Sequence, residues 1–236
     1  MVNLGVINLN ASQQAHAILF MSFPSQLLLH TPKLVRNLFP DVIWHRSRNE
    51  RKIYLTFDDG PSPGITRDVA GILNEYEAKA AFFCLGKNVL LYPEIVNEIS
   101  GKGHEIGNHG YSHRDPWVLP GEETSGEFHK TRELIEYSAG IRTELYRAPF
   151  GHLTPSMLRM VSGYSRIVMW DLMPGEFLEG RSAANCLERI KRNINSGSIV
   201  VLHDNAKCAA KLRAFLPQAM AFIRSEGYEF GIISGF

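Results

Sequence analysis

Two adjacent aspartates interrupt an apolar run early in the chain. The segment KIYLTFDDGPSP (residues 52–63) places Asp58 and Asp59 after five β-branched, aromatic or aliphatic residues and before Gly60 and Pro61. The apolar run predicts a short buried strand, and the Gly-Pro pair predicts a turn. Asp, Gly and Pro are ordinary turn residues, but the carboxyl ends of parallel strands are also where α/β folds keep catalytic groups. The pair is therefore a candidate site.

Two histidines four positions apart are a second candidate. On a helical turn, the spacing of His109 and His113 would place both imidazoles on one side, as in zinc sites. The pair alone is equally compatible with two loop histidines, because the chain has nine. Together with Asp59 they would form a His-His-Asp set with positions left open for water, as catalytic metal sites require.

Two further polar residues follow predicted strands. Arg147 opens the segment RAPFGH (147–152), a rigid loop in which a guanidinium could hold a carboxylate in place. His203 ends the apolar run SIVVLHD (198–204). Each could be an ordinary residue at the end of a strand. Their shared position at strand ends favours a single site that includes both.

The elements that must position these residues alternate between strands and helices. Strands are predicted at 53–57, 80–86, within 104–113, within 144–151, at 166–173, 198–204 and 228–233. Helices are predicted after a cap at Thr66, then at 93–101, 121–139 and 155–164, from Ser182 or Ala183 to near 197, and at 208–225. This alternation predicts a parallel sheet rolled into a barrel of β/α units in one domain.

Composition limits which binding partners and which cellular compartment are expected. Lys plus Arg number 25 and Asp plus Glu 24, and no long basic run is interleaved with aromatic residues, so nucleic acid is not an expected partner. Cys84, Cys186 and Cys208 form no C-x-x-C pair, and the first two are expected in the core. Unpaired cysteines favour a reducing compartment, here the cytoplasm.

The N-terminal part is expected to stand apart from the catalytic domain. Residues 1–50 are predicted as an extension, with Met21 as an alternative start, followed by a short helix that ends at Pro40 and caps the body. Residues 51–236 are predicted as the catalytic domain. The apolar segment AILFMSFPSQLLL is too short and interrupted for a membrane span, and it lacks a basic flank and a clear cleavage site.

Five motifs, in order and spacing, resemble those of the polysaccharide deacetylase family, family 4 of the carbohydrate esterases. They are TFDDGP (56–61), H-x-x-x-H (109–113), RAPFG (147–151), MWDLMPGEF (169–177) and VLHD (201–204). The resemblance implies a distorted (β/α) barrel of seven or eight parallel strands. It also implies one divalent metal ion, usually zinc, and removal of N-acetyl groups from an amino-sugar polymer or oligomer such as chitin or peptidoglycan.

The resemblance assigns a role to each matching residue. Asp58 is the expected base, Arg147 the residue that orients it, His203 the acid and Glu176 the carboxylate beside that acid. The expected metal ligands are Asp59, His109 and His113. The expected substrate-binding residues are Phe150, Trp170, Phe177 and Leu202, with the backbone N–H of Phe150 facing the oxyanion and Leu202 facing the acetyl methyl group.

The chain departs from the family pattern mainly in its fourth motif. Glu176 and Phe177 stand where Asp and Trp are usual, and Met173 stands where an earlier Asp is usual. Asp171 and Asp204 are the alternative carboxylates for His203.

Two other functions stay open: hydrolysis of another linear or cyclic amide on the same scaffold, and carbohydrate binding with weak catalysis. The presence of both a base and an acid argues against the second, because binding alone needs neither.

Overall fold

Seven parallel strands form the centre of the fold, which the computed structural model describes over residues 33–234. They are β1 (Lys52–Asp58), β2 (Ala81–Cys84), β3 (Glu105–Asn108), β4 (Leu145–Tyr146), β5 (Arg166–Ile167), β6 (Ile199–His203) and β7 (Glu229–Phe230). Their order is β5-β4-β3-β2-β1-β6, and β7 pairs with the start of β1. A bridge between Leu172 and Val200 joins the segment after β5 to β6 and curls the sheet back on itself. The expected distorted (β/α) barrel is confirmed.

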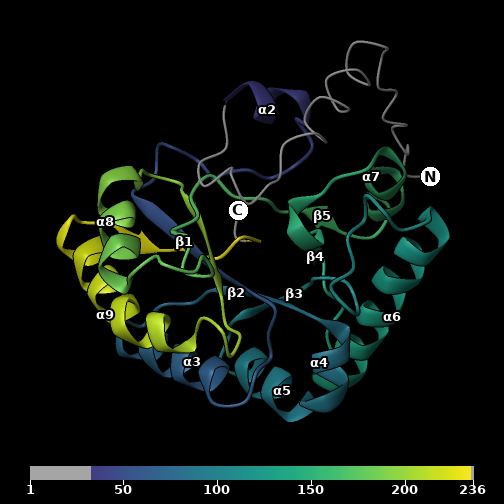
Figure 1. Ribbon diagram of the computed structural model, residues 1–236, viewed down its shortest axis with the longest axis horizontal. Helices are drawn as coiled ribbons and strands as arrows, with labels where there is room; N and C mark the ends of the chain where they lie inside the picture. Colours follow the sequence, from purple (N-terminus) through teal and green to yellow (C-terminus); the bar gives the residue numbers. More distant parts are fainter. Residues whose placement is uncertain (1–32, 235–236) are drawn as a thin grey trace.

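An arc of helices surrounds the strands (Figure 1). The helices within residues 33–234 are α2 (Lys33–Leu38), α3 (Ile65–Glu75), α4 (Gly86–Leu91), α5 (Pro93–Gly101), α6 (Gly121–Ala139), α7 (Pro155–Val161), α8 (Ala183–Asn193) and α9 (Ala209–Ser225), and the 3-10 turn η2 (Pro149–Gly151) follows β4. In Figure 1 the arc runs from α8 and α9 through α3, α5 and α4 to α6, while α2 lies outside it.

The alternation of side chains along β1 decides which way Asp58 points at the carboxyl end of the strand. Leu55 and Phe57 lie in the apolar cluster between the sheet and helices α3 and α9. Tyr54 lies in a second cluster inside the barrel, together with Val201 of β6. Since strand side chains alternate with a period of two, Asp58 shares the inner face with Tyr54 and points inward at the carboxyl end of the strand.

Several predicted helices have the expected ends. The helix predicted at 121–139 is α6 with those bounds, and Pro93 opens α5. Ser182 caps α8, its Oγ accepting the backbone N–H of Asn185 at 3.1 Å. Prolines and capping hydroxyls mark a helix start locally, so the sequence carries the signal without tertiary context.

The predicted cap at Thr66 was wrong. Gly64 occupies the N-cap position of α3. The Oγ1 of Thr66 accepts the N–H of Ser62 at 2.8 Å and donates to the carboxyl of Asp204 at 2.5 Å. This hydroxyl therefore links the start of α3 to the residue that follows β6.

One helix was not predicted, and one predicted strand is much shorter in the structure. Helix α4 has no predicted counterpart, because Leu90 and Leu91 are exposed and the segment lacks an apolar face at helical spacing. The strand predicted at 166–173 ends at Ile167, after which the backbone makes isolated bridges. Tertiary context, which a local pattern does not contain, decides both cases.

The segment before β1 packs on the barrel, as the predicted cap would. Phe39, Val42 and Trp44 are buried in the inner cluster, and Arg48 pairs with Asp171 at 2.6 Å. The predicted extension at residues 1–20 lies outside the described residues. The domain boundary at residue 51 stays a prediction.

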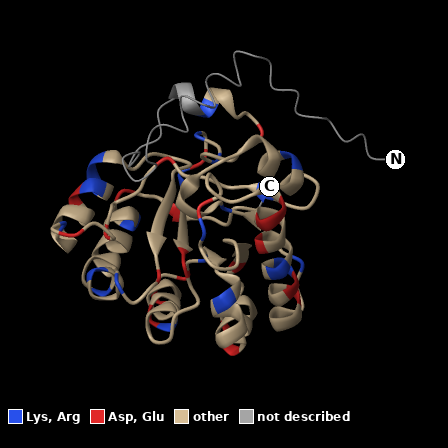
Figure 2. Ribbon diagram, turned by 45° about the vertical axis from the view of Figure 1, so that its right-hand side comes forward, with Lys and Arg blue, Asp and Glu red and all other residues tan. Residues whose placement is uncertain are grey.

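Three expectations from composition concern the cysteines, the distribution of charge and a membrane span. All three cysteines are free and buried, as expected for Cys84 and Cys186. Basic and acidic residues are interspersed over the outer helices (Figure 2). Within residues 33–234, no helix has both the length and the apolar character needed to cross a bilayer.

Candidate metal centre and active site

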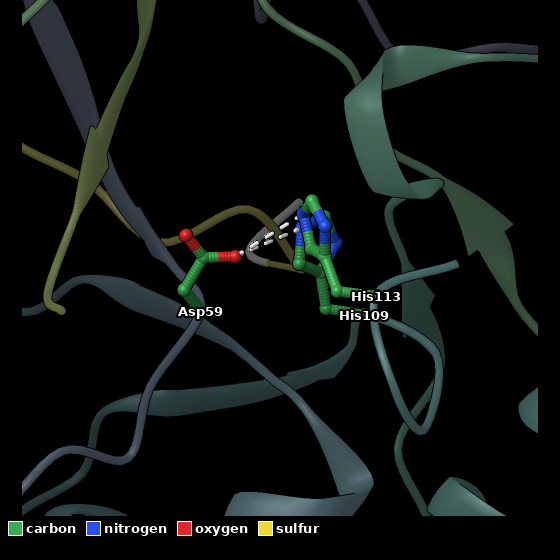
Figure 3. Close-up of side chains that lie close together, drawn as sticks. All are labelled: Asp59, His109 and His113. Carbon is green, nitrogen blue, oxygen red and sulfur yellow. Dashed lines mark ion pairs between the residues drawn. The ribbon is translucent and has the colours of Figure 1, made fainter. Parts of the chain in front are cut away.

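Asp59 and two histidines converge from opposite sides of the site (Figure 3). The Oδ1 of Asp59 lies 3.3 Å from Nε2 of His113 and 3.7 Å from Nε2 of His109. Asp59 comes from the turn after β1, and the histidines come from the loop after β3. The structure therefore brings together the three residues that the sequence predicted as metal ligands.

Left-handed backbone at three positions shapes this site. Asp59, His113 and Phe150 have φ values of 77°, 62° and 59°, which non-glycine residues seldom adopt and which gather at functional sites. The reversal at Asp59 lets its side chain enter the same cleft as Asp58, although neighbours on an extended strand point apart. The two histidines follow β3 on a loop, as the predicted strand within 104–113 allows, and positive φ at Gly110 and His113, in place of a helical turn, shapes the loop that carries both imidazoles.

Two residues that the sequence analysis did not single out hold this loop. Glu127 of α6 accepts the backbone N–H groups of Tyr111 and Ser112 at 3.0 and 2.7 Å, and the Ser112 hydroxyl at 2.7 Å. Asn108, at the end of β3, accepts the N–H of Gly110 at 2.9 Å. The strand-end position of Asn108 could have indicated it, whereas nothing in the sequence separates Glu127 from the other acidic residues of α6.

The ring of His109 is oriented from behind. Its Nδ1 donates to the backbone carbonyl of Arg147 at 2.8 Å, because a carbonyl only accepts. The lone pair is then on Nε2, which faces Asp59. Burial, and next the neighbouring ring of His109, lowers the pKa of His113 to about 4. That imidazole is therefore neutral near pH 7, the state in which histidine binds metals.

The donor set fits a divalent metal ion. The Oδ1 of Asp59 is buried and has no hydrogen-bond partner within the described part of the chain, while Oδ2 accepts from Asn205 at 2.8 Å. Burial raises the pKa of Asp59, but the imidazoles of His203, His109 and His113 and the Asn205 bond outweigh it and lower that pKa. Two imidazoles and one carboxylate suit zinc, and donors about 2.0–2.1 Å from an ion lie roughly 3.3 Å apart.

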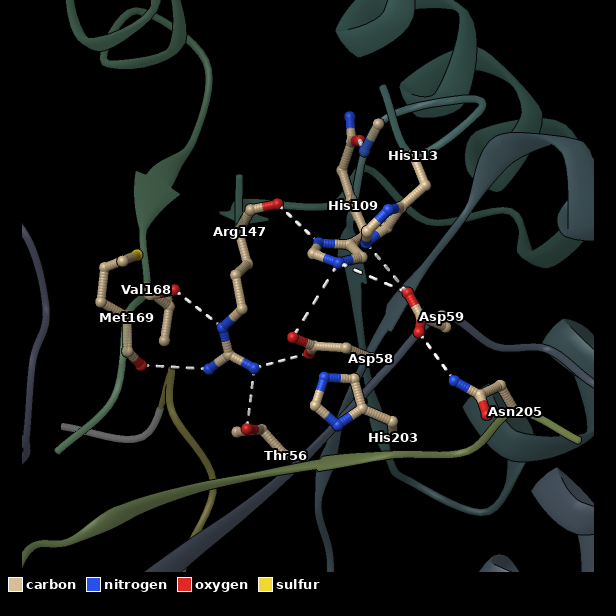
Figure 4. Close-up of polar contacts among 12 residues, drawn as sticks. Thr56, Asp58, Asp59, His109, His113, Arg147, Val168, Met169, His203 and Asn205 are labelled. Atoms are coloured by element: carbon tan, nitrogen blue, oxygen red, sulfur yellow. Dashed lines mark hydrogen bonds and ion pairs between the residues drawn. The ribbon is translucent and has the colours of Figure 1, made fainter. Parts of the chain in front are cut away.

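A buried arginine holds Asp58 from behind (Figure 4). Arg147 is fully buried, and its Nη1 donates to Oδ1 of Asp58 at 2.6 Å and to Oγ1 of Thr56 at 2.8 Å. Its Nε and Nη2 donate to the carbonyls of Val168 and Met169 at 3.0 and 3.1 Å. The guanidinium is thus fixed on three sides, and it fixes one oxygen of Asp58 in turn.

The second oxygen of Asp58 faces the ligand cluster. Oδ2 lies 3.9 Å from Nε2 of His109, farther than Asp59 is from either histidine. The adjacent aspartates therefore have different surroundings. Asp59 faces both imidazoles, whereas Asp58 is tied to Arg147 through one oxygen and turns the other toward His109.

His203 lies beside Asp58 on the neighbouring strand. The two residues are partners in the register of β1 and β6, and Nδ1 of His203 bonds to Oε1 of the fully buried Glu176 at 2.7 Å. Burial lowers the pKa of His203, but the hydrogen bond and charge of Glu176, with Asp59 and Asp58, outweigh it and raise the pKa to about 9. His203 is thus an imidazolium at neutral pH that donates from Nδ1 to Glu176.

The alternative carboxylates for His203 are engaged elsewhere. Asp171 accepts from the N–H of Ile199 at 2.9 Å and from Arg48 at 2.6 Å. Asp204 accepts from the hydroxyl of Thr66. Among the candidates that the sequence offered, Glu176 is the one bonded to the ring.

A cleft of about 240 Å³ opens over these groups. Phe150, Trp170 and Phe177 line it, and their contact with substrate stays a prediction. Leu202 does not line it, which corrects the sequence assignment. Leu202 lies in the outer cluster toward the helices, because alternation along β6 turns Val201 inward and Leu202 outward.

Two residues after β6 also line the cleft without having been predicted. Asn205 bonds to Asp59, and Lys207 lies two positions farther along the loop. Their position just after VLHD was the available signal, since loops at the carboxyl ends of strands carry functional residues.

Comparison with known proteins adds an independent finding. Residues 45–164 match the sequence model of the polysaccharide deacetylase family. The chain is 34% identical over 160 residues to a chitooligosaccharide deacetylase from Azorhizobium caulinodans, covering 67% of this chain and 76% of that protein. It is 30% identical over 162 residues to a peptidoglycan-N-acetylmuramic acid deacetylase from Bacillus subtilis. That match covers 69% of this chain but only 34% of the longer relative.

A solved structure shares the fold. The peptidoglycan N-acetylglucosamine deacetylase Bc1960, in complex with an N-hydroxybenzamide, superimposes with a TM-score of 0.78 at 26% identity. The superposition covers 82% of this chain and 91% of that one. It extends to most of the barrel, whereas the family match ends at residue 164, before Glu176 and His203.

Proposed function

The chain belongs to the polysaccharide deacetylase family, and from that premise we propose that it removes N-acetyl groups from amino sugars of a chitin-like or peptidoglycan-like glycan. One observation carries the proposal. A carboxylate base, a protonated histidine and a metal-type donor set line one cleft, each held by a separate set of buried contacts. Metal-assisted hydrolysis of an amide uses all three: the ion activates water, the base takes its proton and the acid protonates the departing amine.

The metal would be held by Asp59, His109 and His113, and we propose zinc. When bound, the ion supplies Lewis acidity and lowers the pKa of a water from about 15.7 toward roughly 7. The buried, unpartnered Oδ1 of Asp59 supports this assignment.

Asp58 is the proposed base. Its Oδ1 is held by Arg147, so Oδ2 is the atom that takes the proton as water attacks the acetyl carbonyl. Because the guanidinium of Arg147 is fixed by two carbonyls and Thr56, the carboxylate is oriented before substrate arrives.

His203 is the proposed acid. With Nδ1 bonded to Glu176, Nε2 is the nitrogen that donates a proton to the departing amine. The carboxylate of Glu176 favours the charged ring, and Asp59 and Asp58 add to that effect.

The developing oxyanion needs a hydrogen-bond donor in addition to the ion. We propose the backbone N–H of Phe150, in the 3-10 turn that lines the cleft. The left-handed conformation of Phe150 is the local feature that supports this role.

Acetate release tests the function. We expect the protein to release acetate from N-acetylated chitooligosaccharides or peptidoglycan fragments, to lose this activity when a chelator removes the metal, and to regain it with zinc. An N-acetylated amino acid serves as the comparison substrate. Metal-dependent hydrolysis of that amide, with no acetate from either glycan, would replace glycan deacetylation by the second function, hydrolysis of another amide.

A further inference from the structure

A row of aromatic and imidazole rings leads outward from the metal ligands. The ring of His113 lies 4.5 Å from that of Phe150, and Phe150 lies 5.8 Å from His152, centroid to centroid. His152 stacks on Trp117 at 3.3 Å with an angle of 5° between the planes. Phe150 and His113 line the cleft, whereas His152 and Trp117 are not among its lining residues. The row therefore continues past the reaction site.

The outermost ring of this row is held in place. The Oδ1 of Asp115 accepts the backbone N–H of Trp117 at 2.9 Å and bonds to Nδ1 of His152 at 2.7 Å. The indole N–H of Trp117 donates to the carbonyl of Leu153 at 3.3 Å. The ring plane is thus fixed before any ligand binds, which reduces the entropy lost on binding.

Trp117 nevertheless stays partly exposed. His152 covers one face of the indole and is itself buried. The next residue, Val118, is 80% exposed. A large apolar ring with its polar atom satisfied, one face covered and part of its surface exposed, suits the apolar face of a flat ligand.

We propose that Trp117, stacked on His152, forms a binding subsite for a pyranose ring of the glycan, next to the sugar that is deacetylated. The C–H face of a pyranose packs on an indole, and its hydroxyls stay in water at the rim. The inference rests on the proposed function, and it adds that the protein prefers substrates long enough to reach Trp117.

The test compares two substrate lengths. For wild-type protein and Trp117→Ala, kcat and KM are measured on N-acetylated chitobiose and chitopentaose. We expect the variant to lower the ratio of kcat/KM between pentamer and dimer by about tenfold, through KM of the pentamer. Trp117→Phe keeps an aromatic face and should keep most of the length preference. Tyr137→Ala, at an 88% exposed position on α6, is the matched control that should leave the ratio unchanged.

Two outcomes of the kinetic test overturn the subsite. An unchanged ratio in Trp117→Ala would show that the ring does not contact the glycan. Equal loss of kcat on both substrates, with lower metal content, would show that Trp117 only supports the histidine loop. If wild-type protein releases no acetate from either oligosaccharide, the proposed deacetylation of chitin-like substrates is wrong, whether or not the subsite exists. Calorimetric binding of chitopentaose then decides the subsite: weaker binding by Trp117→Ala supports it, and equal or absent binding overturns it.

Discussion

The two sides of the cleft hold their proton-transfer groups in different ways. On the base side, Arg147 donates four hydrogen bonds, to a carboxylate, a hydroxyl and two carbonyls, and is fully buried against Phe83. On the acid side, His203 is held by one bond to Glu176. The second oxygen of Glu176 is buried without a hydrogen-bond partner among residues 33–234. The base is thus fixed by several bonds, and the acid by one strong bond.

The proposed base, its arginine and the three proposed metal ligands keep the residue types of the family pattern, whereas the carboxylate beside the proposed acid does not. The base, its arginine and the three proposed ligands lie within the segment that matches the family model. Met173, Glu176 and Phe177 lie beyond it, on the acid side. A longer carboxylate arm can be accommodated where one bond must be made, but not where four bonds converge on one side chain.

Replacing Arg147 should have the largest effect. Arg147→Ala leaves Asp58 as a buried carboxylate without its counter-charge and removes the partner of two carbonyls. We expect a loss of about 3–5 kcal/mol in the free energy of unfolding, measured by denaturant titration, together with loss of turnover. Arg147→Lys should recover only part, because an ammonium cannot reproduce the planar fork.

A double variant separates charge from packing. In Asp58→Asn/Arg147→Met no buried charge is left unpaired, so stability should recover in part relative to Arg147→Ala, while activity stays lost. If Arg147→Ala lowered the free energy of unfolding by less than about 1 kcal/mol, the bonds of Arg147 would hold the base side no more firmly than one bond holds the acid side.

Replacing the carboxylate on the acid side should have a smaller effect, seen mainly in the pH profile. His203 acts while protonated, so the rate should fall as pH rises through its pKa, which is about 9 in the intact site. Glu176→Gln keeps the hydrogen bond but removes the charge, so the alkaline limb should move about one to two units toward lower pH. His203→Ala should cost about 10²–10⁴-fold in rate and largely remove that limb.

The free energy of unfolding should also depend on pH through the pair formed by His203 and Glu176. Because the folded pKa of His203 lies above the unfolded value of about 6.5, the pair stabilises the protein fully below about pH 6.5. That contribution is lost as pH rises through about 9.

The pH–rate profile gives the contradicting outcome. An alkaline limb that does not move in Glu176→Gln would show that the charges of Asp58 and Asp59 set the pKa of His203 instead.

The sequence predicted features with local signals well and features that depend on tertiary packing poorly. Local signals located β1, β6 and the start of α5, because a short apolar run and an N-terminal proline need no tertiary context. The left-handed backbone at Asp59 was not predictable, since it depends on the turn packing over Asp204. The inward face of β6 could have been predicted from alternation, and the assignment of Leu202 to the pocket missed it.

The measurement that tests the central claim most directly is the metal content of two variants that differ by one position along the chain. The claim is that Asp59 binds the ion while Asp58 serves as the base. Asp58→Asn and Asp59→Asn are purified in parallel with wild-type protein, and the metal is quantified by elemental analysis alongside acetate release.

We predict about one ion per chain in Asp58→Asn, with turnover lost, and little metal in Asp59→Asn. The contrast follows from Oδ1 of Asp59, which faces both imidazoles, and from Asp58, which is tied to Arg147. Loss of metal in Asp58→Asn with full retention in Asp59→Asn would contradict the account and reverse the two roles.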